Sequence, residues 1–300
     1  MRQPCLIEQS LDLLRRRATL DNAAISAAFS QPDPDGAFRG PYGEYLRALG
    51  RLRPAVVFAF PPKAAGTFLR TAAVFATGGQ LVRIVHAQGG RDAQPYLPLL
   101  IDYYLGGLCE GTLVSHIHMQ ALPANCRILE AFDIKPIVIV RSIPDMLASY
   151  WDMLETNETA RREGLNCPIP RDFVSMDAAR KADFMIDMIA PWYVGYYATW
   201  FDYRLEDPNR TCLLRYQDVR KQPAATLARA LSHAGAPIAL EDCQRATERA
   251  WAERETLRFN KGMEGRARAY FSPHHRERLA EMLSFHPALR FWSNDLLGVA

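Results

Sequence analysis

The chain has 300 residues, of which 49% are hydrophobic and 23% are charged, and its formal net charge is +3. This length and composition fit one large globular domain. The small net charge and the dispersed Lys and Arg residues argue against a nucleic-acid partner. No apolar run is long enough to span a bilayer, and Arg15–Arg17 lies where a signal peptide would be apolar. The sequence therefore predicts a cytoplasmic protein without a membrane span.

The six cysteines lie at wide, irregular spacings, without a Cys-x-x-Cys or Cys/His cluster. This pattern favours buried free thiols over a disulfide framework or a zinc site.

Five short apolar runs rich in β-branched residues are predicted to be strands. They are Ala55–Phe60, Leu81–His86, Thr112–Ile117, Pro136–Val140 and Thr211–Tyr216. Each is almost continuously hydrophobic, as expected for strands that are covered on both faces. The helical stretches between and after them are Thr67–Ala76, Pro144–Glu155, Ala178–Tyr203 and Pro223–Ala234. Strands that alternate with helices predict an α/β fold with a central, mainly parallel sheet flanked by helices.

The whole chain is predicted to form a single domain. Residues 1–50 are a helical lead-in, interrupted by a Pro- and Gly-rich loop at Gln31–Gly43. Residues 55–235 form the α/β core, and residues 236–300 form a helical C-terminal part. The polar stretch Thr156–Asp177 is predicted to be a long loop or lid. Because parallel sheets bind ligands at the carboxyl ends of their strands, the turns after the strands are the candidate sites.

The turn after the first strand has the composition of an anion site. This first-turn motif consists of Lys63, Ala64, Ala65, Gly66, Thr67 and Phe68. Its small residues let backbone N–H groups approach a ligand, and a helix that begins near Thr67 points its positive end the same way. A tight turn with a surface lysine is an equally open alternative. Lys63 precedes the only glycine, so the motif is neither a Walker A loop nor a G-x-G-x-x-G fingerprint.

The fourth predicted strand ends directly in Arg141, and the helix after it begins near Pro144 and carries Ser149. A P-loop NTPase usually has an acid at a comparable strand end, to hold Mg²⁺. A guanidinium favours an anion instead and repels a metal. A surface salt bridge between Arg141 and Asp145 is the structural alternative for this Arg–Ser motif (Arg141–Ser149).

The two motifs together resemble those of sulfotransferases that use 3′-phosphoadenosine 5′-phosphosulfate (PAPS). The first-turn motif is similar to the PKSGTTW-type 5′-phosphosulfate loop of that family. Arg141, followed eight residues later by Ser149, is similar to its 3′-phosphate motif, R-N-P-x-D-x-x-x-S-Y. The resemblance implies a P-loop-like nucleotide-binding architecture, PAPS as co-substrate, 3′-phosphoadenosine 5′-phosphate (PAP) as product, and no metal.

Two further segments extend the resemblance to the middle of the chain. Ser115–Pro123 resembles the family's T-H-L-P-x-x-L-L-P segment, and His116 falls on its catalytic histidine. Leu213–Asp218 resembles the Y-E-D strand end, so Tyr216 is expected to approach the adenine.

Near the C-terminus, the segment that contains Asn260, Lys261 and Gly262 resembles the R-K-G-x-x-G loop that closes over the nucleotide. Asn260 stands where the family has arginine. The resemblance thus implies a 3′-phosphate clamp that Arg258 or Arg266 would have to complete.

The chain departs from the family pattern at other positions as well. Phe68 replaces a tryptophan but keeps a ring that can stack on adenine. Ala64 and Ala65 replace Ser-Gly, which removes one hydroxyl from the phosphate loop. Val114 stands where many relatives carry a lysine that contacts the sulfuryl group.

The resemblance implies in-line transfer of a sulfuryl group to an acceptor hydroxyl or amine. His116 is expected to act as general base, because an imidazole with a pKa near its usual value of about 6.5 is neutral at cytoplasmic pH. Lys63 is expected to stabilise charge on the leaving bisphosphate. His118 lies two positions further and points the same way in an extended chain, so it stays an alternative base.

The acceptor is a small molecule, a lipid or a glycan, and the residues do not distinguish these classes. Pro95–Leu105 is predicted either to line an apolar acceptor pocket or to pack in the core, and the aromatic stretch Trp192–Tyr203 is predicted to be core. A homodimer stays open. Two other functions also stay open: a small-molecule kinase of P-loop-like fold, against which Arg141 counts, and a catalytically silent nucleotide-binding relative.

Overall fold

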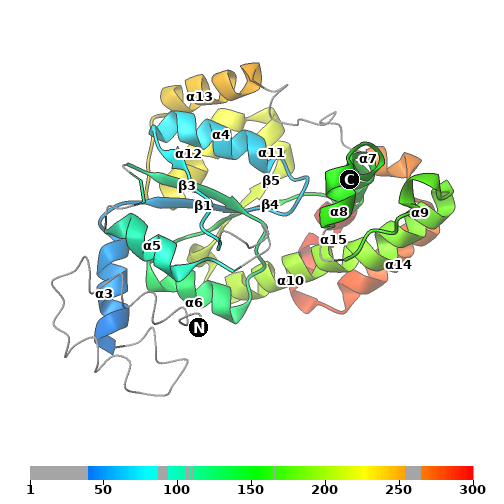
Figure 1. Ribbon diagram of the computed structural model, residues 1–300, viewed down its shortest axis with the longest axis horizontal. Helices are drawn as coiled ribbons and strands as arrows, with labels where there is room; N and C mark the ends of the chain where they lie inside the picture. Colours follow the sequence, from blue (N-terminus) through cyan, green and yellow to red (C-terminus); the bar gives the residue numbers. More distant parts are fainter. Residues whose placement is uncertain are drawn as a thin grey trace, which may run out of the picture.

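A five-stranded sheet forms the centre of the molecule, with the strand order β2-β3-β1-β4-β5 (Figure 1). The computed structural model describes residues 40–86, 94–105, 108–109, 111–164, 167–253 and 265–299. The strands are β1 (Ala55–Ala59), β2 (Gln80–Leu81), β3 (Leu113–Ile117), β4 (Ile137–Val140) and β5 (Cys212–Arg215). All pairings between these strands are parallel. The predicted α/β fold with a parallel central sheet is confirmed.

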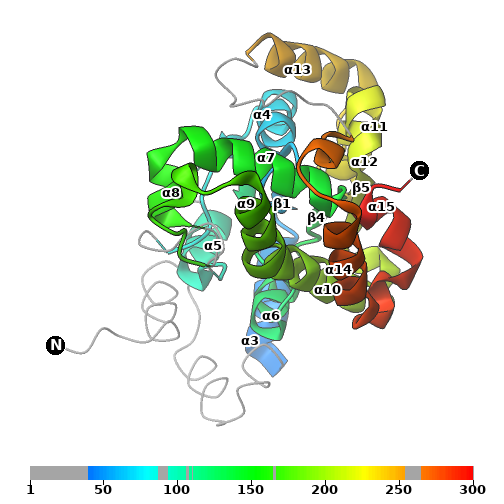
Figure 2. The same cartoon turned by 90° about the vertical axis from the view of Figure 1, so that its right-hand side faces the viewer.

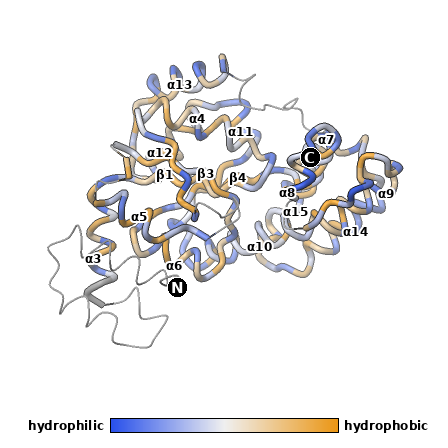
Figure 3. The backbone as a smooth tube through the Cα atoms, in the orientation of Figure 1, coloured by the Kyte–Doolittle hydropathy of each residue, from blue (hydrophilic) through white to orange (hydrophobic). Residues whose placement is uncertain are grey.

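The central strands lie in the interior because their residues are continuously hydrophobic. Every residue of β1, β3 and β4 is buried, and Figure 3 shows the hydrophobic centre beneath helices whose residues alternate in hydropathy. The second predicted strand, Leu81–His86, is largely wrong. Only Leu81 belongs to the sheet, because the chain then turns away and the carbonyl of Ile84 accepts a hydrogen bond from Tyr96 N (2.7 Å).

Helices cover both faces of the sheet. They are α3 (Gly40–Gly50), α4 (Gly66–Thr77), α5 (Leu97–Tyr104), α6 (Pro123–Ala131), α7 (Ile143–Thr156), α8 (Glu158–Glu163), α9 (Ala178–Phe184), α10 (Ala190–Glu206), α11 (Tyr216–Lys221), α12 (Pro223–His233), α13 (Leu240–Ala252), α14 (Pro273–Ser284) and α15 (Ser293–Leu297). In Figure 1, α4, α11, α12 and α13 lie above the sheet, and α3, α5 and α6 lie below it. Helices α7, α8, α9, α14 and α15 gather beyond the carboxyl ends of the strands, the edge that faces the viewer in Figure 2.

The predicted helices match α4, α7 and α12 to within one residue at each end. The long helix predicted at Ala178–Tyr203 is interrupted by a π-helical turn at Met185–Ile189. Pro191 follows this turn and has no N–H for the regular ladder, which explains the wider turn. The predicted loop Thr156–Asp177 contains α8, because the Asn157 side chain caps that helix by accepting from Ala160 N (3.0 Å). Of the predicted helical lead-in, residues 40–50 form α3, which begins within the predicted loop Gln31–Gly43, and residues 1–39 lie outside the described residues.

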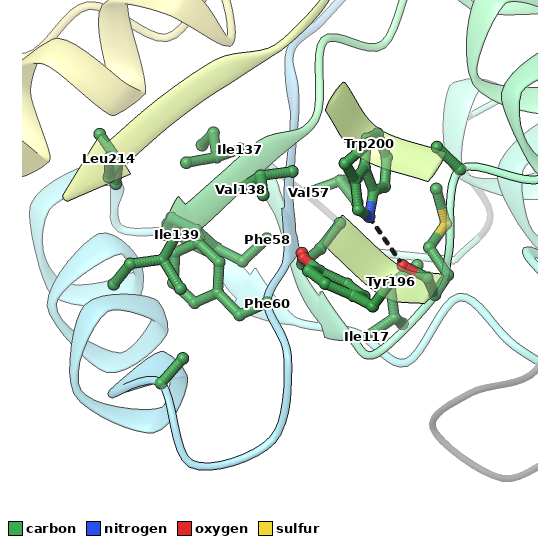
Figure 4. Close-up of a cluster of buried hydrophobic side chains, with 14 of the residues drawn as sticks. Val57, Phe58, Phe60, Ile117, Ile137, Val138, Ile139, Tyr196, Trp200 and Leu214 are labelled. Carbon is green, nitrogen blue, oxygen red and sulfur yellow. Dashed lines mark hydrogen bonds between the residues drawn. The ribbon is translucent and has the colours of Figure 1, made fainter. Parts of the chain in front are cut away.

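Helix α10 holds the carboxyl ends of the central strands through its aromatic side chains, which are buried as predicted. The Tyr196 hydroxyl donates to the carbonyl of Ala59 at the end of β1, and Trp200 Nε1 donates to the carbonyl of Met119 after β3 (3.0 Å; Figure 4). Tyr193 reaches the carbonyl of Pro62 (3.3 Å). These bonds satisfy buried backbone carbonyls that have left the sheet.

Tyr197 makes the corresponding contacts at the end of β4. Its hydroxyl accepts from Arg141 N (3.1 Å) and donates to the carbonyl of Ile139 (3.1 Å). Burial raises the pKa of the Tyr197 hydroxyl, so it stays protonated at neutral pH. Among the described helices, none combines the length and hydrophobicity that a bilayer crossing requires.

Replacing Tyr197 by Phe should lower the free energy of unfolding by about 1–3 kcal/mol, because the buried Arg141 N–H loses its acceptor. Chemical denaturation measures the change. Tyr104→Phe is the control, because the Tyr104 ring is also buried but its hydroxyl makes no hydrogen bond to a described residue. Equal effects of the two substitutions would contradict the role assigned to Tyr197.

Candidate functional site

The first-turn motif begins with two residues in a left-handed backbone conformation. Lys63 and Ala65 both have φ of +65°, a region that costs an L-residue about 1–2 kcal/mol. Ala65 precedes the first residue of α4 and has no side-chain oxygen with which to cap the helix. The first N–H groups of α4, near the half-buried Thr67, are therefore available to an anion. Ala64 and Phe68, also predicted site residues, are buried.

His116 lies against the start of α4. A Cβ atom added at Gly66 would lie 2.4 Å from His116 Nε2 and 2.5 Å from its Cε1. The sheet explains this approach, because β3 pairs with β1 and His116 is in register with Phe58. The imidazole is only 8% exposed. The structure therefore brings together the predicted base and the predicted phosphate loop, and it requires glycine at position 66.

His118 belongs to the same cluster. Its Nδ1 lies 2.6 Å from the carbonyl oxygen of Phe60. Because a carbonyl only accepts hydrogen bonds, Nδ1 carries the hydrogen, and a neutral His118 has its lone pair on Nε2. The rings of His116 and His118 are nearly perpendicular, with centroids 5.0 Å apart. Val114, on the same strand, is fully buried.

Arg141 connects the ends of three strands. It follows β4, its guanidinium lies 4.0 Å from the centroid of the Tyr216 ring after β5, and its Nη1 donates to the carbonyl of Lys63 after β1. The side chain is only 9% exposed. Its buried Nε makes no hydrogen bond to the described part of the chain. An unsatisfied donor on a buried cation is costly, and an anion at this point would satisfy it.

The alternative pairing of Arg141 with Asp145 is wrong. The Asp145 carboxylate instead accepts hydrogen bonds from the backbone N–H groups of Gly265 (3.0 Å) and Ala267 (3.1 Å). It therefore attaches the segment from Gly265 onward to α7. Arg141 keeps its charge for another partner.

Lys63 of the first-turn motif lies against α7, the helix that carries Ser149 of the Arg–Ser motif. Lys63 Nζ lies 3.7 Å from Met153 Sδ on α7. Ser149 is one helical turn before Met153, so both lie on the same side of α7, and Ser149 is buried. Lys63 and the Arg–Ser motif thus border one region. No group of three or more His, Cys, Asp or Glu side chains within the described ranges is arranged to hold a metal ion.

Of the predicted closing loop, Asn260, Lys261 and Gly262 lie outside the described residues. Arg266 is described and forms an ion pair with Asp152 of α7. The hydrogen bond to Asp152 raises the pKa of the Arg266 guanidinium. Arg266 is thus bound to α7 in this structure, and Arg258, the other candidate for completing the clamp, lies outside the described residues.

One aromatic residue near the first-turn motif was missed in the sequence. Trp251, in the polar helix α13, meets Phe68 edge to face, with ring centroids 6.1 Å apart, and remains 48% exposed. A large aromatic side chain in an otherwise polar helix was the available signal. By contrast, Pro95–Leu105 contains the mostly buried helix α5, and Tyr103 donates from there to the carbonyl of Pro54 (2.5 Å). The burial of these side chains favours core packing for that segment.

Gly66→Ala should lower the free energy of unfolding by about 1–3 kcal/mol, because the added methyl group overlaps the His116 ring. In a His116→Ala background the same substitution should cost much less. Gly195→Ala in α10 is the control, since a Cβ there would lie 3.9 Å from Gln120 Oε1, an ordinary contact. Chemical denaturation of the unaltered protein and the three variants of this cycle tests the prediction. An unchanged cost of Gly66→Ala in the His116→Ala background would contradict the packing described.

Comparisons with known proteins agree with this fold. A family model described as "Sulfotransferase domain" matches residues 110–284, and no curated protein matches the chain. Among solved structures, mouse sulfotransferase SULT7A1 complexed with PAP is similar, with a TM-score of 0.56, 13% identity, and coverage of 83% of this chain and 90% of that chain. Retinol dehydratase in complex with androsterone and inactive cofactor PAP gives a TM-score of 0.45 and 14% identity, with coverage of 83% of this chain and 85% of that chain.

At these identities the likeness to SULT7A1 shows the fold, while the family model covers more than half of the chain. The chain therefore belongs to the sulfotransferase family and is a PAPS-dependent sulfotransferase.

Proposed function

We propose that the first-turn motif and the Arg–Ser motif bind the two ends of PAPS. The N–H groups at the start of α4 and the Lys63 ammonium take the 5′-phosphosulfate, and Arg141 with Ser149 takes the 3′-phosphate. The observation that carries the proposal is the position of Arg141: it is buried, joins the ends of three strands, and has an Nε donor without a partner among the described residues. A phosphate oxygen is the acceptor that this donor lacks.

The adenine is proposed to lie near Phe68 and Tyr216. Phe68 lies in the first turn of α4, beside the phosphate loop, and the Arg141 guanidinium stacks on the ring of Tyr216. The partly exposed Trp251 ring meets Phe68 edge to face, so it extends this aromatic surface toward solvent. An aromatic surface next to a cation suits a purine attached to a phosphate.

The chemistry follows from the positions of His116 and Lys63. His116 accepts the proton of the acceptor hydroxyl or amine while the new bond to sulfur forms. The bond between sulfur and the bridging oxygen breaks, and the electron pair leaves on the 5′-phosphate of PAP. Lys63 can stabilise that charge, because its carbonyl is held by Arg141 and its amine reaches α7. His116 Nε2, packed at the start of α4, is close to the place where a 5′-phosphosulfate would bind.

His118 is the second candidate for the base. The Phe60 carbonyl holds its Nδ1 and leaves Nε2 as the basic nitrogen. The proposal favours His116 because its ring contacts the phosphate loop directly. A panel of hydroxyl- and amine-bearing small molecules, lipids and glycans with labelled PAPS would identify the acceptor class.

Donor binding should depend on the 3′-phosphate. PAP should bind at least tenfold more tightly than AMP, because each charge-assisted hydrogen bond contributes about 1.5–3 kcal/mol. Arg141→Ala should remove most of this preference, and Arg220→Ala on α11 is a control at a residue outside the proposed site. Isothermal titration calorimetry measures the affinity of each of the three proteins for PAP and for AMP. Equal affinity of the unaltered protein for AMP and PAP would exclude a 3′-phosphate site at Arg141.

Loss of the base should affect turnover rather than binding. His116→Ala should lower kcat by about 10²–10⁴-fold, the usual contribution of a positioned base, with PAP affinity nearly unchanged. His118→Ala should reduce kcat less. Steady-state assays with labelled PAPS distinguish the two residues. Normal turnover in His116→Ala together with lost turnover in His118→Ala would transfer the role to His118.

A further inference from the structure

The segment Trp292–Val299 packs against the carboxyl edge of the sheet. It contains α15, which contacts α7, and Leu296 anchors it because that side chain is fully buried. In the view of Figure 2, α15 lies beside β5, at the same edge as α7. Nothing in the sequence pattern related this segment to the nucleotide motifs, since it follows the last of them by about thirty residues.

Gly298 makes the closest contact with the Arg–Ser motif. A Cβ added at Gly298 would lie 2.6 Å from Ser142 Oγ and 3.1 Å from Ser142 Cβ. Ser142 directly follows Arg141 and is the N-cap of α7, where its Oγ accepts from Asp145 N (3.3 Å). Gly298 also has φ of +67°, a conformation that favours glycine. The backbone of the segment therefore lies directly on the cap that begins α7.

The same segment contacts the end of β5. Asp295 Oδ1 lies 3.7 Å from Arg215 Nε, and the Arg215 guanidinium lies 5.3 Å from the centroid of Trp292. Arg215 immediately precedes Tyr216, the residue on which Arg141 stacks. The Asp295–Arg215 pair is partly exposed, with 55% of the Arg215 side chain in solvent, so it contributes little by itself. The contact between Gly298 and Ser142 is therefore the main support for the inference, and the Asp295–Arg215 pair is secondary.

We propose that Trp292–Val299 positions the 3′-phosphate site, with Gly298 as a positioning residue that acts through Ser142. The segment supports the chain neighbours of both Arg141 and Tyr216, so it sets how these two side chains stack. This inference rests on the proposed function, since it assigns a role in binding the 3′-phosphate of PAPS. Ser142 can transmit a displacement of Gly298 to Arg141, because its side chain is short and buried and its hydroxyl already caps α7.

Gly298→Ala tests the proposal, with Gly235→Ala as a matched control. Gly235 also has a positive φ, of +78°, but a Cβ there meets nothing within 4 Å. Both substitutions strain the backbone, but only the alanine at position 298 would overlap the side chain of Ser142. Calorimetry should show a loss of PAP affinity on the order of tenfold in Gly298→Ala, with a much smaller change for AMP. Gly235→Ala should change neither affinity.

Thermal melting shows whether Gly298→Ala folds. If it does not fold, Ser142→Ala provides a second test. Ser142→Ala removes the contacted hydroxyl and should cause the same selective loss for PAP, and adding Gly298→Ala to it should cause little further loss. Equal losses for AMP and PAP, or unchanged PAP affinity in a folded Gly298→Ala, would overturn this inference alone. An unaltered protein that does not prefer PAP to AMP would overturn the proposed function and this inference with it.

Discussion

The site depends on one constraint: backbone groups at the carboxyl ends of β1, β3 and β4 are buried where the sheet can no longer satisfy them. Side chains of α10 do so instead, and Tyr197 is the central contact because it bonds both to Ile139 and to the N–H of Arg141. Tyr196 and Trp200 donate to the carbonyls of Ala59 at the end of β1 and of Met119 after β3. The turns that carry the proposed phosphate ligands are thereby fixed to one rigid helix, so binding has little ordering cost to overcome.

Arg141 is the second element of the account, and its environment explains why it suits an anion. The nearest acid in its own motif, Asp145, accepts two backbone N–H groups from the segment that begins at Gly265. This arrangement removes the obvious internal partner for the guanidinium. It also attaches the end of the predicted closing loop to α7, the helix that carries Ser149. Helix α7 thus connects the proposed 3′-phosphate ligands with the segment that follows the predicted closing loop.

The features that could be predicted from the sequence are those that depend on residues close together in the chain. Continuous apolar runs located β1, β3, β4 and β5, and the Lys63–Phe68 and Arg141–Ser149 motifs located both proposed phosphate sites. Contacts between distant segments were not predictable. The need for glycine at 66 comes from a ring on another strand, and Trp251 reaches Phe68 only because α13 packs on α4. The strand predicted at residues 81–86 was largely wrong, because a β-branched composition does not show where an edge strand leaves its sheet.

We propose that these turns form a prebuilt site for the bisphosphate, and a crystal structure of the protein with PAP would test this proposal. In such a structure the 5′-phosphate should lie on the N–H groups of Gly66 and Thr67, and the 3′-phosphate should lie on Arg141. The proposal also predicts that the backbone of both turns moves by less than about 1 Å, as in other preorganised complexes. PAP bound without contact between Arg141 and the 3′-phosphate, or turns rearranged by several ångströms, would contradict it.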